Sequence, residues 1–117
     1  MAPEKMQISV VMPCFNAAKT LPEAIESIQA QTLHDWEFII VDDGSNDDSP
    51  AIVERYAASD KRIRPVSQIH GGIVSALQQG CARAQGRFIV RMDADDIALP
   101  ERLKKQRDYM EQHPDTE

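Results

Sequence analysis

Short runs of β-branched and other apolar residues recur along the chain and alternate with segments of a different period. The runs cover residues 7–12 (QISVVM), 38–41 (FIIV), 62–66 (RIRPV) and 87–92 (RFIVRM). Each run is short, as is typical of buried parallel strands. Pro13 is expected to end the first run and Asp42 the second, and Gly86 and Asp93 flank the fourth. The pattern therefore predicts four strands.

Between these runs, apolar residues recur at intervals of three and four, which predicts helices. Thr20-Leu-Pro-Glu23 has the form of a capping box with proline in the first turn, Ser49-Pro50 starts a second helix, and Pro100 opens a last helix that runs to about Gln112. Gly80 is expected to permit close packing of the third helix on the sheet. The residues expected to face inward are Leu21, Ala24, Ile25, Ile28, Ile52, Val53, Tyr56, Ala57, Ile73, Leu77, Gly80, Cys81, Ala84, Leu99, Leu103 and Met110.

The alternation of strands and helices predicts an α/β fold, a Rossmann-like parallel sheet with helices on both faces. The length of 117 residues fits one domain, so residues 1–117 are expected to form a single unit. In such sheets ligands bind outside the carboxyl ends of the strands, where the strand order switches. The residues that follow the strands are therefore the first candidates for a site.

Charge and cysteine usage narrow the possible partners. The formal net charge is −6 and the bases are scattered, so nucleic acid is not an expected partner. Acidic residues can still meet a phosphate ligand when a divalent cation lies between them. Cys14 and Cys81 are expected to be buried thiols of a cytosolic protein, and no stretch approaches the roughly 20 apolar residues of a membrane span.

Three polar clusters follow predicted strands: Pro13-Cys-Phe-Asn16, Asp42-Asp-Gly-Ser45 and Asp93-Ala-Asp-Asp96. In extended backbone Asp93 and Asp95 project to the same side, so both carboxylates can face one hard cation such as Mg²⁺ or Mn²⁺. Three aspartates in four residues repel one another unless they are solvated or neutralised, so turn propensity alone explains them poorly. This cluster favours a metal site.

Several other residues have a plain structural interpretation. Asp47, Asp48 and Ser49 are interpreted as helix caps. Phe15 is either a core aromatic or a platform on which a base stacks, and by itself the core is favoured. The segment His70-Gly71-Gly72 is either a plain turn or a glycine-rich approach to phosphate at a helix N-terminus.

Taken together, these residues resemble the family-2 inverting glycosyltransferases of the GT-A fold, and the resemblance covers nearly the whole chain. Six pieces in the same order carry it: residues 8–16 (ISVVMPCFN), 27–32 (SIQAQT), 36–45 (WEFIIVDDGS), 71–72 (GG), 86–89 (GRFI) and 91–103 (RMDADDIALPERL). The resemblance implies a nucleotide-sugar-binding portion of such an enzyme, with a divalent metal, Mn²⁺ or Mg²⁺, as cofactor.

The resemblance also implies roles for individual residues. Pro13 and Phe15 would line the pocket for the base, and Asp43 would hydrogen-bond it. Asp93 and Asp95 form the Asp-x-Asp motif, with Asp95 as the direct metal ligand, while Asp96 would assist or would cap the next segment. Asn16 and Asp42 would support the loops. The expected nucleotide-binding set is Pro13, Phe15, Asn16, Asp42, Asp43, Gly72 and Asp93, and the expected metal set is Asp95, Asp93 and Asp96.

The implied reaction is transfer of a sugar from a nucleotide diphosphate, with UDP as the family's commonest carrier, to an acceptor hydroxyl with inversion. The acceptor would be a glycan or lipid-linked glycan, in assembly of a surface polysaccharide. The protein would be cytoplasmic, with a peripheral position at the inner face of the membrane as a further expectation. Where relatives often have Ala-Arg-Asn, this chain has Ala76-Leu77-Gln78, which removes a cation that could hold the donor.

The family's second half, which supplies the acceptor site and a carboxylate base, is expected beyond Glu117. No catalytic base is assigned, little transfer is expected from this chain alone, and an exposed docking face would promote self-association. A nucleotidyltransferase-like domain and a non-catalytic nucleotide-binding module are the alternatives. The first would carry a glycine-rich, basic loop after the first strand, where this chain has Pro13-Cys-Phe-Asn16.

Overall fold

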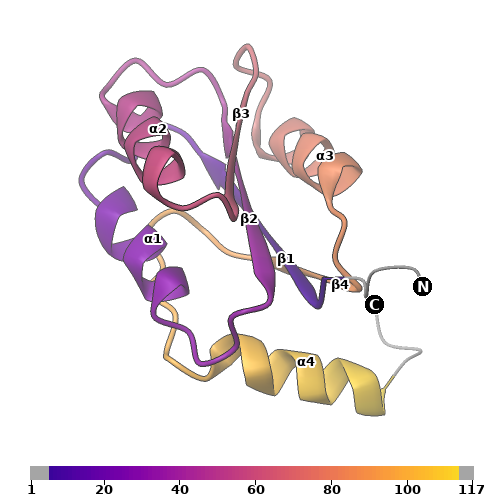
Figure 1. Cartoon of the computed structure of the whole chain (residues 1–117). Helices are drawn as coiled ribbons and strands as arrows, with labels where there is room; N and C mark the ends of the chain where they lie inside the picture. The colour runs from indigo at the N-terminus through magenta and orange to yellow at the C-terminus, as the bar shows by residue number, and fades with distance from the viewer. Residues whose placement is uncertain (1–5, 114–117) are drawn as a thin grey trace.

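A computed structural model describes residues 6–113 of the chain. Strands and helices alternate along it, as the sequence predicts (Figure 1). The strands are β1 (Ile8–Cys14), β2 (Trp36–Asp42), β3 (Ile63–Ser67) and β4 (Phe88–Arg91), and the helices are α1 (Leu21–Gln29), α2 (Ser49–Ser59), α3 (Ile73–Arg83) and α4 (Arg102–Gln112).

The four strands form one parallel sheet in the order β3-β2-β1-β4. Ile8 of β1 pairs with Trp36 of β2 on one side and with Phe88 of β4 on the other. The chain thus places β2 and β3 on one side of β1 and then crosses over to add β4 on the other side. The strand order switches between β1 and β4, which is where ligands bind in open parallel sheets.

Helices cover both faces of the sheet, which confirms the predicted α/β architecture. Helices α1, α2 and α4 pack on one face, and α3 packs on the other (Figure 1). All seven residues of β2 are buried, because a strand covered on both faces has no solvent side. The larger cluster includes Trp36, Phe38, Met12, Ile25 and Leu103, and the smaller one consists of Ile39, Val41 and Ala76.

Gly80 confirms the expected close approach of α3 to the sheet. A Cβ atom added at this position would overlap Cγ1 of Val11 in β1 and lie 3.3 Å from Cγ2 of Val41 in β2. Only a residue without a side chain lets the helix backbone lie this near to the strands.

Strand β1 continues through Pro13 and Cys14, so the expectation that Pro13 ends it is wrong. The carbonyl of Val11 accepts a hydrogen bond from Met92, while that of Cys14 accepts one from Asp43. The backbone N–H and C=O positions of Val11 and Pro13 therefore point toward β4, and those of Cys14 point toward β2. Because β4 ends at Arg91, the missing N–H of Pro13 falls where no ladder partner is needed.

Several predicted details at helices differ from the structure. Thr20 stands at the N-cap of α1, but its hydroxyl donates to the carbonyl of Ala17 at 3.3 Å and makes no capping bond. Its helical φ and ψ of −103° and −21° differ from the extended backbone of a capping box. The predicted capping box is therefore wrong.

Three residues expected to face inward are exposed: Ile73, Cys81 and Leu99. Ile73 is the first residue of α3 and is 50% exposed. Cys81 is rotated by about 100° from Gly80, which faces the strands, and Leu99 precedes α4.

Cys14 is buried as expected, and Trp36 of β2 is buried too. Within residues 6–113, no helix has the length and apolar character needed to cross a membrane.

Candidate functional site

A cleft of about 760 Å³ opens at the carboxyl edge of the sheet. Its walls come from the end of β1 and the loop after it, the end of β2, the start of α3 and the turn after β4. Seven of the predicted site residues line this cleft: Pro13, Phe15, Asn16, Asp43, Gly72, Asp93 and Asp95. The sheet thus brings together three polar clusters that lie far apart in the sequence, whereas Asp42 and Asp96 do not line the cleft.

Phe15 belongs to the cleft and not to the core. The residue is 46% exposed, which excludes the core interpretation that the sequence favoured. Its ring lies 4.6 Å from the ring of His70, centroid to centroid, with 39° between the planes. An exposed aromatic face at a cleft wall can support a planar ligand by stacking.

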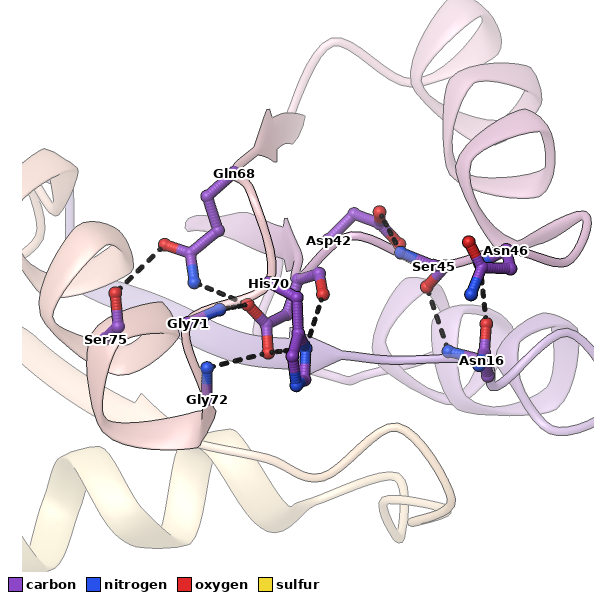
Figure 2. Close-up of polar contacts among 10 residues, drawn as sticks. Asn16, Asp42, Ser45, Asn46, Gln68, His70, Gly71, Gly72 and Ser75 are labelled. Atoms are coloured by element: carbon purple, nitrogen blue, oxygen red, sulfur yellow. Dashed lines mark hydrogen bonds and ion pairs between the residues drawn. The ribbon is translucent and has the colours of Figure 1, made fainter.

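Asp43 is an almost buried carboxylate at the end of β2, with 5% of its side chain exposed. Its Oδ1 accepts hydrogen bonds from Gln68 Nε2 at 2.7 Å and from the N–H of Gly71 at 2.8 Å (Figure 2). Its Oδ2 accepts one from the N–H of Gly72 at 3.1 Å. These bonds, the one from Gln68 above all, hold the pKa of Asp43 below its usual range.

The same contacts change the role of the glycine pair before α3. Gly72 stands at the N-cap of α3 with a φ of 95°, a left-handed conformation that suits glycine. The N–H groups of Gly71 and Gly72 both bond to Asp43, so the carboxylate of Asp43 occupies the start of this helix. In this conformation the two N–H groups that could approach a phosphate are already engaged.

Asn16 and Asp42 join two loops at the rim of the cleft. The N–H of Asn16 donates to Ser45 Oγ at 2.9 Å, and Asn16 Oδ1 accepts from the N–H of Asn46 at 2.8 Å (Figure 2). Asp42 Oδ2 accepts from the N–H of Ser45 at 3.1 Å. Asn16 adopts a φ of 49°, which asparagine tolerates better than most residues. These bonds fix the position of the neighbouring Phe15 and Asp43.

Asp47 and Ser49 do more than cap a helix, which corrects their interpretation. Asp47 Oδ2 accepts from the N–H of Ala18 at 3.1 Å, and Oδ1 accepts from the N–H of Ser49 at 2.9 Å. Ser49 Oγ accepts from the N–H of Ala17 at 3.0 Å. Both side chains thus tie the loop before α1 to the start of α2, and Asp47 also lines the cleft. Asp48 is the N-cap of α2 and makes no side-chain capping bond.

The acidic turn after β4 gathers three carboxylates. Each of Asp93, Asp95 and Asp96 offers an oxygen atom, and these atoms lie within 4.8 Å of one another. Asp93 forms an ion pair with Arg91 at 3.2 Å, and Asp96 Oδ2 accepts from the N–H of Asp93 at 3.1 Å. A set of clustered, accessible oxygen atoms fits a hard divalent cation, while the bond to Asp93 shows that Asp96 also closes the turn.

Cys14 lines the cleft, and its thiol is expected to be unreactive. Its side chain is buried, and burial raises the pKa of its thiol to about 11. The thiol therefore stays protonated at neutral pH, which makes it a poor nucleophile and a poor metal ligand.

His70 and Gln68 take part in the site, although little in the sequence indicates it. His70 stands there only as part of a turn, and nothing around Gln68 marks it. Both contact Asp43 across 25 or more residues of chain, and such contacts follow from the path of the segment between β3 and α3. No local motif records that path.

Comparison with known proteins places the chain among transferases of sugars. A family model described as "Glycosyl transferase family 2" matches residues 9–116. The putative glycosyltransferase EpsE of Bacillus subtilis is 37% identical over 109 residues, a match that covers 92% of this chain and 39% of EpsE. The chain thus spans well under half the length of this relative.

Solved structures with the same fold include two described with nucleotide sugars. TarS of Staphylococcus aureus in complex with UDP-GlcNAc superposes with a TM-score of 0.85 and 28% identity, over 93% of this chain and 32% of that one. The mannosyltransferase PcManGT of Pyrobaculum calidifontis, in complex with GDP-Man and Mn²⁺, gives a TM-score of 0.72 and 27% identity, over 79% of this chain and 28% of that one.

Proposed function

The chain belongs to glycosyl transferase family 2, and from this premise we propose that it forms the donor-binding part of an enzyme that transfers a sugar from a nucleotide diphosphate to an acceptor hydroxyl. The observation that carries the proposal is the cleft at the carboxyl edge of the sheet, which unites Phe15, Asp43 and the acidic turn. Phe15 offers a stacking surface for a base, and Asp43 offers a buried acceptor for one of its N–H groups.

We propose UDP as the nucleotide and inversion at the anomeric carbon as the outcome. Support comes from the family match and from TarS, whose structure was determined with UDP-GlcNAc. PcManGT, determined with GDP-Man, is a reason to test guanine as well. Pro13, Asn16 and Gly72 complete the proposed donor site by lining the cleft, and Asp42 supports its rim.

A divalent cation is part of the proposal because of the charge in the cleft. The carboxylates of Asp43, Asp47, Asp93 and Asp95 line it, and a diphosphate would be repelled by them. We propose that Asp95 and Asp93 hold Mn²⁺ or Mg²⁺ and that Asp96 orders their turn. Such a cation, when bound, would stabilise the negative charge that grows on the leaving diphosphate.

None of the carboxylates that line the cleft within residues 6–113 is proposed as the catalytic base. Hydrogen bonds, with Gln68 the strongest for Asp43 and Ser49 for Asp47, hold the pKa values of these two carboxyls below their usual range. A carboxylate stabilised in this way accepts a proton poorly. Asp93 and Asp95 are assigned to the cation. The base therefore has to come from outside this set.

The acceptor and the location of the protein are proposals as well. We propose a glycan or lipid-linked glycan as acceptor, in assembly of a surface polysaccharide, at the cytoplasmic side of a membrane. We also propose self-association through the exposed apolar side chains of Ile97 and Leu99, which line a second, smaller hollow beside α4. Sedimentation that does not change with protein concentration would contradict self-association.

The test of the donor site is a calorimetric titration of UDP into the protein, with and without Mn²⁺, repeated on Asp95→Ala. We expect binding that depends on the metal and is lost in the variant, because Asp95 is exposed at the centre of the acidic turn. Asp35→Ala is the matched control, since Asp35 is an exposed aspartate just before β2, at the opposite end of the strands.

A folded protein that binds neither UDP nor GDP in the presence of Mn²⁺ would exclude the proposed donor site. Equal binding by Asp95→Ala and the wild type would exclude Asp95 as a metal ligand but would not contradict the proposed base pocket.

A further inference from the structure

His70 lies between the two groups that a nucleobase would need to contact. Its imidazole packs against Phe15 with 4.6 Å between the ring centroids. Its Nδ1 lies 3.0 Å from Asp43 Oδ2 and 3.1 Å from the backbone carbonyl oxygen of Asp43 (Figure 2). One flat, nitrogen-bearing ring thus packs at a tilt of 39° against Phe15 and contacts Asp43 at the same time.

Asp43 has no free capacity for another donor while His70 stays in place. Its two carboxylate oxygens already contact Gln68, Gly71, Gly72 and His70. The carboxylate accepts three hydrogen bonds, and the His70 ring fills the remaining space beside Oδ2, so a further N–H group has to replace one of these partners.

Of the four partners, His70 is the one that can leave most easily. The two glycine N–H groups are backbone atoms fixed at the start of α3, and the half-buried Gln68 is also held by Ser75 Oγ at 3.4 Å. The His70 side chain is 60% exposed and can rotate into solvent without a change in the backbone conformation.

The distance between the Phe15 and His70 rings also indicates that His70 has to move before a base can bind. Stacked planar groups need about 3.4 Å between their planes, and a base between Phe15 and His70 would require twice that separation. The observed 4.6 Å between the two ring centroids leaves no room for it. A base that reaches both Phe15 and Asp43 must therefore take the space that His70 fills.

We propose that His70 occupies the base position in the free chain and that a nucleotide binds by displacing its imidazole ring. This inference rests on the proposed donor site and adds a residue that opposes binding there. The chain would bind nucleotide with full strength only in the fraction of molecules whose His70 has moved away, and this lowers the apparent affinity.

The first test compares affinities for UDP, measured by calorimetry with Mn²⁺, in the wild type, His70→Ala and His70→Asn. We expect His70→Ala to bind roughly three- to tenfold more tightly, the range expected for losing one contact between rings and one partly exposed hydrogen bond. His70→Asn keeps a donor for Asp43 but has no ring, so its affinity should lie between the other two. His34→Ala is the matched control, because His34 is exposed and precedes β2, far from the cleft, and should bind as the wild type does.

A second test needs no variant. The imidazole resonances of the wild-type protein are followed by NMR as UDP and Mg²⁺, the diamagnetic metal, are added. Those of His70 should move to positions typical of a solvated ring, while those of His34 stay in place. His70 resonances that remain unchanged at saturation would overturn the inference.

The outcomes separate this inference from the function on which it rests. If the wild type binds UDP and His70→Ala binds equally or more weakly, the displacement is wrong and the donor site stands. If neither protein binds UDP, the donor site fails and the inference falls with it.

Discussion

At the scale of single residues, adjacent positions in this protein have different structural roles. Asp42 and Asp43 are neighbours, yet Asp42 holds the loop after β2 through Ser45, while Asp43 lines the cleft and accepts hydrogen bonds from the two glycines before α3. The two side chains leave the end of β2 in opposite directions, as successive residues of a strand do. A paired aspartate motif can therefore contain one residue that lines a cleft and one that holds a loop.

The two cysteines provide a test at this scale. With a pKa of about 11, only roughly one Cys14 thiol in a thousand is ionised at pH 8, and the thiol is also buried, whereas Cys81 is exposed. We expect one fast-reacting thiol in the native protein and two after denaturation, as counted with a chromogenic disulfide reagent. Cys81→Ala should remove the fast thiol. Two fast thiols in the native wild type would show that Cys14 is not shielded.

At the scale of secondary-structure elements, the close contact between α3 and the sheet limits which residue can stand at position 80. Gly80 faces Val11, a β-branched residue that is fully buried and has few rotamers with which to make room. The helix could not carry any larger residue at this position without moving outward. The N-terminus of the same helix, at Gly72, Ile73 and Ala76, forms one wall of the cleft.

Gly80→Ala tests this contact. Alanine stabilises a helix by about 1 kcal/mol relative to glycine, whereas overpacking a filled core costs about 1–3 kcal/mol. We expect overpacking to prevail and the free energy of unfolding in urea to fall by about 1 kcal/mol. Gln78→Ala, at an exposed position of the same helix, should stay within about 0.5 kcal/mol of the wild type. A more stable Gly80→Ala would mean that helix and sheet are less closely packed than the structure shows.

At the scale of the whole molecule, one buried carboxylate connects several parts of the chain. Glu37 of β2 is 2% exposed in its side chain and accepts hydrogen bonds from Ser9 of β1, Arg64 of β3 and the N–H of Gln85 after α3. Burial by itself would raise the pKa of Glu37, but these three partners outweigh it, and the pKa lies below its ordinary value.

The stability of the protein should therefore depend on the charge of Glu37. A group whose pKa is lowered by folding stabilises the folded state above its unfolded pKa, near 4.5, and the effect is lost as the pH falls through the folded pKa. We expect Glu37→Gln to lose about 1–3 kcal/mol of unfolding free energy at pH 7. The difference from the wild type should shrink below pH 4.5. Urea unfolding at several pH values measures both.

The exposed Glu54→Gln in α2 is the control and should show no such pH dependence. A gap between Glu37→Gln and the wild type that is the same at pH 7 and well below pH 4.5 would contradict the assigned role of the charge.

The sequence by itself determined the order of elements, the parallel sheet with helices on both faces, the family and the three clusters that follow strands. Hydrophobic periodicity and the residues that end strands are local properties, and strands joined by crossover helices run parallel, so their carboxyl ends meet at one edge of the sheet. The close approach at Gly80 was also predictable, because glycine destabilises the interior of a helix and is tolerated there mainly where a side chain would not fit.

Only the tertiary structure decided what each polar residue of the cleft contacts. It placed Pro13 inside β1, brought Gln68 and His70 onto Asp43, and made Asp47 a link between two loops. These outcomes depend on which side of a strand a residue faces and on contacts between residues 25 or more positions apart. Periodicity and turn propensity describe only near neighbours in the chain, so they contain no record of such contacts.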